Sequence, residues 1–358
     1  MQRRSFLAQL PAAVAAADRT ESPRPSKPRR RILAWAHAHT DFAGPAGEVR
    51  RTLDRAREAG IDALLPFVHS HPEENQAWYN SALSGFVVKD LLSQATELGR
   101  AAGIEIHPIL GGVTDVGLSP AARKRRSYIS DKPGGSGQDG RFCASHAATR
   151  TGSPRIAADI LDHHTVQGLH LDYIRYIDTG NGLKWPCQCR ACRMKYREIF
   201  GREDITAADL QVPGAAFKYL QFRNTNIAEV VRQVREIALQ NGVELSMAAR
   251  ADYFGSALVE GQDWADWARR GWLDFLCPMS YTTDRAEHRR LLKMQLDVVG
   301  GSCPVYSGIG RKWSAGELTT ADMLLQAEDA FSLGASGICL FRFNALTTAD
   351  FAALKDLR

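Results

Sequence analysis

The 358-residue sequence predicts a single (β/α)8 TIM barrel, in which eight parallel strands alternate with eight outer helices. From residue 31 onward, short apolar runs alternate with longer amphipathic runs, as expected for repeated strand–helix units. The alternative, a doubly wound open sheet, lacks its usual motifs: no Gly-x-Gly-x-x-Gly follows the first strand, and no Walker-type phosphate loop occurs. With 44% hydrophobic and 24% charged residues, the composition excludes collagen, coiled coils and wholesale disorder.

The eight units follow one another along the chain. Apolar runs predict strands at Arg31–Ala36, Ile61–Val68, Ile104–Leu110, Gly168–Tyr173, Glu244–Arg250, Leu273–Met279, Pro304–Ser307 and Gly337–Phe343. Amphipathic runs, ended by glycines or started by capping residues, predict helices at Gly47–Ala59, Lys89–Ala102, Pro154–His164, Ala215–Gln240, Trp264–Arg270, Arg285–Val298, Thr320–Ser332 and Thr347–Leu357. An insertion after the fourth strand contains one further predicted helix, Cys192–Phe200.

The N-terminal segment is expected to lie outside the barrel. Residues 1–17 resemble a twin-arginine export signal, because Arg3 and Arg4 precede a mildly apolar stretch that ends in small residues at Ala15–Ala17. The alternative is a disordered basic N-terminus. Residues 18–30 are polar and proline-containing, which predicts a disordered linker, so the barrel is expected over residues 31–358. We therefore expect export to the periplasm or the exterior, and a cytoplasmic location if the signal is not functional.

The net charge of +5 belongs to this N-terminal segment. Residues 1–31 contain eight basic and two acidic side chains, whereas the remaining residues contain 37 basic and 38 acidic ones. The barrel is therefore near neutral, and no nucleic-acid partner is expected. No run of about 18 apolar residues occurs, so no membrane span is expected. The oligomeric state is left open.

Chemistry-bearing residues gather where the predicted strands end, which is where active sites of such barrels lie. The strand-end residues that we expect to form a site are Trp35, His37, His39, Asp41, His107, His170, Asp172, Tyr173, Arg175, Tyr176, Arg250, Asp252, Tyr281, Trp313 and Asn344. Because side chains alternate along a strand, His170 and Asp172 share one face, and Arg250 and Asp252 share one face of the next strand.

The sequence at the end of the fourth strand indicates which kind of ligand the pocket would bind. An inward-facing Asp172 would be surrounded by the ring faces and the cation of Tyr173-Ile-Arg-Tyr176. Aromatic faces stack on the apolar side of a sugar, and charged groups bind its hydroxyls, so this pocket favours a carbohydrate ligand. The alternative is a structural ion pair between Asp172 and Arg175 that closes the top of the barrel.

Several motifs resemble glycosyl-hydrolase-like family 10, a family of TIM barrels. Gly168-Leu-His-Leu-Asp-Tyr-Ile-Arg-Tyr176 is similar to its signature on the fourth strand, although Ile177 stands where proline is usual. The block from Gly261-Gln-Asp-Trp264 to Pro278-Met-Ser-Tyr281 is similar to a second motif, and Gly337–Phe341 resembles the last strand. The resemblance covers about residues 31–355. It implies a glycoside hydrolase in which Asp172 corresponds to the aspartate of the fourth strand.

We expect hydrolysis of glycosidic bonds in an oligo- or polysaccharide by a pair of carboxylates, without a cofactor. Asp172 is the candidate acid. Its candidate partners are Asp252 first, because it ends the neighbouring strand, and Asp41 second; Asp284 also follows a strand. The residues expected to bind the sugar are Trp35, His37, His39, His107, His170, Tyr173, Arg175, Tyr176, Arg250, Tyr281, Trp313 and Asn344.

Two other functions fit parts of the same pattern. The first is a metal-dependent barrel hydrolase, because His37-Ala-His39 resembles the histidine pair of amidohydrolases and His69, His71, His107 and His170 lie at further strand ends. The corresponding histidines on the fifth and sixth strands are absent from this sequence. The second is a catalytically silent barrel that binds carbohydrate.

The insertion contains Cys187, Cys189 and Cys192, which we expect to cluster away from the barrel axis. Together with Cys143 or His146 they have the composition of a structural zinc site. In an oxidising compartment, two of them would instead form a disulfide. Cys277, Cys303 and Cys339 lie in predicted strands and are expected to be small buried apolar residues.

Overall fold

The computed structural model describes residues 30–44, 47–69, 76–83, 86–112, 120–132 and 138–357. The expected export signal and nearly all of the linker therefore lie outside the described residues, as does His71. Eight parallel strands form the centre: β1 (Arg31–His37), β2 (Ala63–Phe67), β5 (Glu105–Ile106), β8 (Gly168–Leu171), β9 (Glu244–Ala249), β10 (Phe275–Pro278), β11 (Tyr306–Gly310) and β14 (Gly337–Phe341).

The strands close into a barrel. Hydrogen bonds join β11, β14, β1, β2 and β5 in one run and β10, β9 and β8 in another. Single parallel bridges complete the circle, from Phe67 through Ile109 to His170 on one side and from Leu276 to Val305 on the other. This arrangement confirms the predicted (β/α)8 barrel, and each strand lies in the predicted apolar run or overlaps its end.

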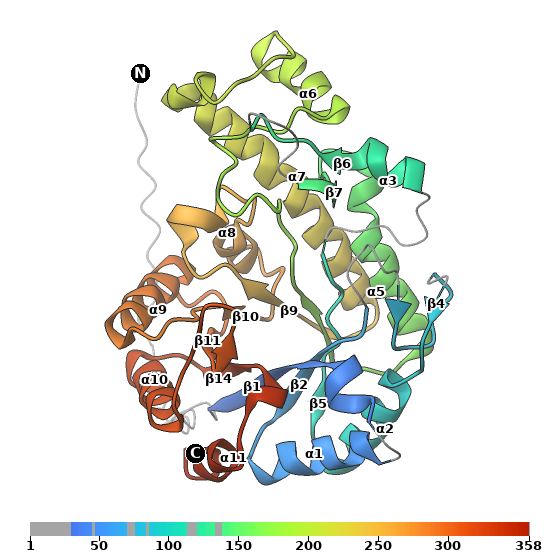
Figure 1. Ribbon diagram of the computed structural model, residues 1–358, viewed down its shortest axis with the longest axis vertical. Coiled ribbons are helices and arrows are strands. Elements are labelled where there is room, and N and C mark those ends of the chain that lie inside the picture. Colours follow the sequence, from blue (N-terminus) through green and yellow to red (C-terminus); the bar gives the residue numbers. More distant parts are fainter. Residues whose placement is uncertain are drawn as a thin grey trace, which may run out of the picture.

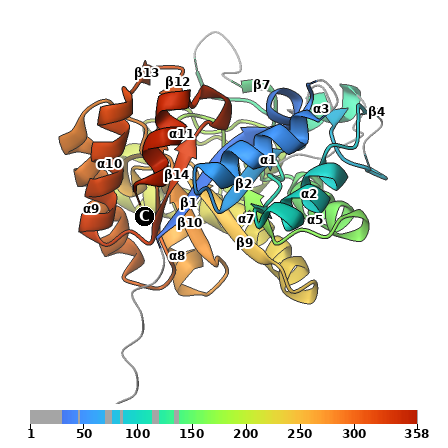
Figure 2. The ribbon, with the colours of Figure 1, turned by 90° about the horizontal axis from the view of Figure 1, so that it is seen from below.

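A ring of helices covers the outside of the strands, as both ribbon views show (Figures 1 and 2). One helix follows each strand: α1 (Glu48–Glu58), α2 (Leu92–Ala102), α5 (Gly152–His163), α7 (Pro213–Gln240), α8 (Trp264–Arg269), α9 (Arg285–Val299), α10 (Thr320–Leu333) and α11 (Thr348–Lys355). Helix starts use the expected chemistry: the Asp284 carboxylate caps α9, and Thr347 with Asp350 forms a capping box on α11. No helix in the described ranges is long and apolar enough to cross a membrane.

Alternation along the strands separates two cores. On β1, Ile32, Ala34 and Ala36 face the helices, whereas Leu33 and Trp35 face the barrel interior. The interior is filled by side chains from all around the barrel, including Ala63, Leu65, Ile109, Ala248, Phe275, Cys277, Tyr306 and Cys339. The barrel is therefore packed at its middle and forms no continuous channel, so a cavity can open only at an end of the barrel.

The seventh strand runs to Gly310, three residues beyond its predicted end, through two glycines. A side chain at Gly308 would place its Cβ 2.2 Å from the carbonyl oxygen of Pro278 on the neighbouring strand. Glycine is therefore required here by the close approach of β10 rather than by a turn.

The remaining elements decorate the ends of the barrel and the insertion. They are β3 (Gln76–Ala77), β4 (Phe86–Val87), α3 (Pro120–Arg126), β6 (Ser127–Tyr128), β7 (Gln138–Phe142), α4 (Ala147–Arg150), α6 (Arg190–Phe200), β12 (Lys312–Trp313) and β13 (Gly316–Glu317). In Figure 1, α6 and the N-terminal part of α7 extend above the strands together with β6 and β7. The insertion thus forms an upper part that rises from the barrel.

Candidate functional site

A cavity of about 1070 Å³ opens at the C-terminal ends of the strands. Its lining comes from strand ends and from the loops that follow them: Trp35, His37, His39, Phe67, His69, Trp78, Gly111, Gly112, Arg141, Phe142, Asp172, Tyr173, Arg175, Ile177, Arg250, Met279, Tyr281, Lys312, Trp313, Ser314, Phe341 and Arg342. Nine of the fifteen predicted site residues are in this lining: Trp35, His37, His39, Asp172, Tyr173, Arg175, Arg250, Tyr281 and Trp313.

Asp172 lies one residue beyond β8, where the alternation of the strand still holds. His170 faces the barrel interior, so Asp172 faces the same way and reaches the cavity. The backbone N–H of Tyr173 donates a hydrogen bond of 2.6 Å to Asp172 Oδ1, and Arg175 Nη1 lies 3.7 Å from the same oxygen. Tyr173 has a φ of 54°, a left-handed conformation that is uncommon outside glycine, and this turn exposes its ring to the cavity.

Burial raises the pKa of Asp172 to about 6, against the lowering effects of Arg175 and of the Tyr173 N–H. The Asp172 side chain is 8% exposed, so the loss of hydration outweighs the effect of the nearby guanidinium on the pKa. About half of the Asp172 carboxyls therefore hold a proton at pH 6, and about a tenth still do at pH 7.

A buried carboxylate, Glu260, supports the floor of the site. Its Oε2 lies 3.1 Å from Arg175 Nε and 3.1 Å from Arg250 Nε, and its side chain is 1% exposed. Two arginines that line the cavity are thus held by one anion behind it. Sequence analysis missed Glu260, because the residue lies in a loop well beyond the end of β9.

The Gln-Asp-Trp motif holds the backbone of the two neighbouring strand ends. Gln262 accepts a hydrogen bond of 2.9 Å from the Arg250 N–H and donates one of 3.2 Å to the Ile174 carbonyl. Trp264 Nε1 donates to the Arg250 carbonyl at 3.2 Å. The motif therefore fixes the backbone from which Asp172, Arg175 and Arg250 project.

Aromatic rings form the base and one wall of the cavity. Trp35 packs edge-on against Tyr281 and Phe341, with ring centroids 6.0 and 6.2 Å apart, and Tyr281 stacks on Phe341 at 4.9 Å. Trp313 lies 6.4 Å from Tyr281. Such ring faces offer apolar surface at the bottom of a polar cavity.

Histidines form the opposite wall. His37 stacks on Phe67 at 5.1 Å, and His39 lies 5.5 Å from Trp78. Burial lowers the pKa of His37 to about 4, so its imidazole is neutral at physiological pH. Within the described part of the chain, the groups of side chains that could share a metal ion do not include the rim histidines.

Three predicted sugar-binding residues lie in the core instead. His170 is fully buried between Trp35 Nε1, 3.0 Å away, and Ser246 Oγ, 2.8 Å away. His107 is also fully buried, near Glu105 and Glu244 at the N-terminal ends of the strands, and Tyr176 packs in the insertion against Ser145 and Asn226. None of these three side chains lines the cavity, so we correct the expectation that they bind sugar. A position near a strand end in the sequence did not ensure contact with the cavity.

The expected partner carboxylates also lie outside the cavity lining. After Ala249 the chain turns into η3 (Tyr253–Ala257), and Asp252 caps this turn by accepting a 3.0 Å hydrogen bond from the Gly255 N–H. After His37 it coils into η1 (Ala38–Phe42), where Asp41 accepts from the His37 N–H at 2.7 Å.

Two further strand-end residues have local roles. Asp284 caps α9 by accepting hydrogen bonds from Ala286 and Glu287. The side chain of Asn344, in η4 (Phe343–Ala345), donates to Thr40 Oγ1 at 3.1 Å. In each of these four cases the strand ends before the residue, so the alternation that we extrapolated no longer applies.

Several lining residues were not predicted. Phe67, Met279 and Phe341 end strands or follow them directly, and the alternation used for Asp172 would have found them. Trp78, Arg141 and Phe142 come from the connections between barrel units, Trp78 directly after β3 and the other two from the end of β7, and the sequence offers no periodic signal for these short elements.

No family model matches the sequence, and the search of curated proteins found no match. Among solved structures, the chain is similar to the PgaB (BpsB) glycoside hydrolase domain from Bordetella bronchiseptica, with a TM-score of 0.74 and 17% identity over 92% of this chain and 99% of that one.

It is also similar to the catalytic domain of a β-amylase from Paenibacillus polymyxa, with a TM-score of 0.58 and 10% identity over 90% and 94% of the two chains. A GH18 chitinase from Pseudoalteromonas aurantia has a TM-score of 0.53 and 12% identity over 92% and 100%. At these identities the likenesses show that the chain has the α/β barrel fold found in these glycoside hydrolases.

Proposed function

We propose that the protein is a glycoside hydrolase that cleaves an oligo- or polysaccharide, with Asp172 donating a proton to the leaving glycosidic oxygen. The observation that carries the proposal is a carboxyl with a pKa of about 6 in a cavity with an aromatic base. A general acid must hold its proton near the working pH, and burial gives Asp172 this property. The barrel fold and the resemblance to glycosyl-hydrolase-like family 10 support the same reaction, with less weight than the site itself.

The residues around Asp172 have distinct roles in this proposal. Tyr173 and Trp313 present ring surface to the sugar, and Arg175 orients the Asp172 carboxyl. Among the described residues, Asp172 is the sole carboxylate in the cavity lining. We therefore assign Asp172 alone the proton-donor role, because Asp252 and Asp41 lie outside the lining and accept hydrogen bonds from nearby backbone N–H groups.

The cavity charges favour a substrate with acidic groups. The described lining contains five cationic residues and one carboxylate: Arg141, Arg175, Arg250, Lys312 and Arg342 against Asp172. Glu260 offsets part of the charge of Arg175 and Arg250, and Glu317 pairs with Lys312 at 3.0 Å. A positive excess remains beside the aromatic base, and it would attract a glycan that carries carboxylate or sulfate groups.

Export through the N-terminal twin-arginine-like segment remains part of the proposal, since an exported enzyme would meet polysaccharide directly. It is tested by locating the full-length protein after expression with Arg3 and Arg4 either intact or replaced by lysine. Retention of both forms in the cytoplasm would contradict export.

The central experiment is a screen of matched polysaccharides with wild type, Asp172→Asn and Asp252→Asn. Each pair differs in charge, for example glucuronate-bearing and unsubstituted xylan, and reducing ends are counted. We expect wild type and Asp252→Asn to release ends from an acidic member, and Asp172→Asn to bind it while releasing ends at least about 100-fold more slowly.

Two results would favour the other functions. Binding without cleavage by wild type on every glycan would favour a carbohydrate-binding barrel. Hydrolysis of an ester or amide substrate that is lost on chelation and restored by metal would favour a metal-dependent hydrolase.

A further inference from the structure

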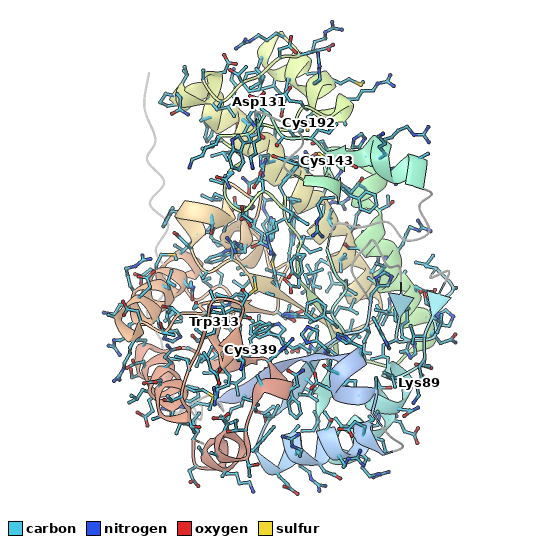
Figure 3. All side chains as sticks on the ribbon, viewed as in Figure 1. Lys89, Asp131, Cys143, Cys192, Trp313 and Cys339 are labelled. Carbon is cyan, nitrogen blue, oxygen red and sulfur yellow. The ribbon has the colours of Figure 1, made fainter. Side chains whose placement is uncertain are left out.

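Four cysteines meet in the upper part of the molecule, outside the cavity. Cys143, Cys187, Cys189 and Cys192 are all buried, and their sulfur atoms all lie within 4.8 Å of one another. Figure 3 shows Cys143, which follows β7, close to Cys192 of the insertion in the upper part of the molecule, far from Cys339 in the barrel. The cluster therefore brings together two distant segments of the chain, and Cys143 rather than His146 completes the group of ligand atoms.

The sulfur spacings have the values of a tetrahedral metal site. The Sγ atoms of Cys143 and Cys192 are 3.7 Å apart, and those of Cys143 and Cys187 are 3.8 Å apart. Four sulfurs at about 2.3 Å from a central zinc lie about 3.8 Å from one another. A disulfide would require about 2 Å between two of them, and all seven cysteines, each in the described part of the chain, are free.

We propose that these four cysteines bind one structural Zn²⁺ ion as thiolates. The set contains no oxygen or nitrogen ligand and is closed to solvent, which is the composition of a structural zinc site rather than a catalytic one. Each thiol gives up its proton when the metal binds. Ser145 Oγ lies 3.0 Å from Cys192 Sγ and would donate a hydrogen bond to the bound thiolate, as outer partners of metal ligands commonly do.

The backbone around the cluster shows what the ion would hold together. Cys189 is the N-cap of α6, and Cys187 forms a bridge with Ser130 from the connection between β5 and α5. Cys143 directly follows Phe142, which lines the cavity together with Arg141. The ion would therefore fasten one wall of the cavity to the insertion, without contacting the substrate.

The test measures metal in the purified full-length protein produced in zinc-supplemented medium. We expect about one zinc per chain by elemental analysis, and X-ray absorption showing four sulfur neighbours at about 2.3 Å. Cys187→Ser and Cys192→Ser should lose most of the zinc and lower the melting temperature by about 10 °C or more. The matched control is Cys303→Ser, which replaces a buried cysteine outside the cluster and should retain the zinc.

If the cluster variants fail to fold, wild type alone decides the question. A mercurial that titrates thiols should release one equivalent of zinc to a chromogenic indicator from the folded protein. Three results would overturn the proposal: a metal-free chain whose unreduced mass shows two disulfides, iron in place of zinc, or zinc that is not released by the mercurial. None of these readouts depends on the proposed glycosidase activity, so the two proposals fail separately.

Discussion

The neighbouring strands β8 and β9 end in similar sequences but place their aspartates differently. At each strand end, a residue that faces the barrel or its cavity is followed two positions later by an aspartate: His170 and Asp172 at the end of β8, Arg250 and Asp252 just after β9. Asp172 reaches the cavity, whereas Asp252 caps a turn. The position of the strand end explains the difference. β8 ends at Leu171, directly before Asp172, whereas β9 ends at Ala249, three residues before Asp252.

At these two strand ends, alternation places the first residue after the strand in the cavity, whereas the third residue after β9 no longer follows it. Asp172 is the first residue after β8 and Arg250 is the first after β9, and both line the cavity. Asp252 is the third residue after β9, where the backbone has already turned. The end of β8 therefore presents a carboxyl to the cavity, whereas the aspartate after β9 caps a local turn.

The largest expected effect is the loss of turnover in Asp172→Asn. Asparagine keeps the size of the side chain but cannot donate a proton to the leaving oxygen, so turnover should fall by about 10²- to 10⁴-fold. Reducing-end release on the cleaved glycan, with binding measured separately, checks this. If the folded variant retained its turnover, Asp172 at the end of β8 would not be the proton donor.

The second prediction concerns the anion that joins the two strand ends. Glu260→Gln leaves Arg175 and Arg250 partly buried without their shared partner and should lower the free energy of unfolding by about 3 kcal/mol. Urea unfolding measures the change. The matched control is Glu229→Gln, which breaks a solvent-exposed pair with Arg232 and should cost under about 1 kcal/mol. Equal effects of the two substitutions would show that the contacts of Glu260 with Arg175 and Arg250 add no more stability than a solvent-exposed ion pair does.

The third prediction is a pH dependence that belongs to Asp172. Its folded pKa of about 6 lies above its ordinary value of 3.8, so the folded protein binds this proton more tightly than the unfolded chain does. Stability of wild type relative to Asp172→Asn should therefore fall by about 1–2 kcal/mol as the pH rises from 4 to 6, and then level off.

Turnover should decline above about pH 6 for the same reason, because the acid loses its proton. Unfolding of both proteins across this range, with a pH–rate profile of wild type, provides the measurements. A stability difference that does not vary with pH would indicate that burial leaves the carboxyl pKa unchanged.

The fold was predictable from the sequence because each barrel unit repeats the same local pattern. The runs that become β1, β8 and β14 are apolar, have strand length and are followed by helical periodicity. Close contacts between neighbouring strands were not predictable. Nothing in the sequence around Gly308 indicates that β10 lies too close for a side chain at this position.

The site was predictable at the strand ends and in the motifs that directly follow them. Trp35, Asp172 and Arg250 follow from alternation, and Tyr281 from a motif, whereas Glu260, Arg141 and Trp78 come from the connections between barrel elements, whose path depends on tertiary contacts. The cysteine spacing indicated a cluster, and the structure was needed to choose Cys143 as its fourth member.

The smallest expected effect is that of Asp252→Asn, because asparagine caps a helical turn about as well as aspartate. Its amide oxygen can still accept the hydrogen bond from the Gly255 N–H, so stability should change by less than about 0.5 kcal/mol. Turnover should stay within about twofold of wild type, because no proton moves through this group. Asp252→Ala, which removes the cap, should cost about 1 kcal/mol with turnover again nearly unchanged. If Asp252→Asn instead abolished turnover in a folded, stable protein, the carboxylate charge itself would be required. The end of β9 would then supply the second catalytic carboxylate, and its turn would have to open toward the cavity when substrate binds.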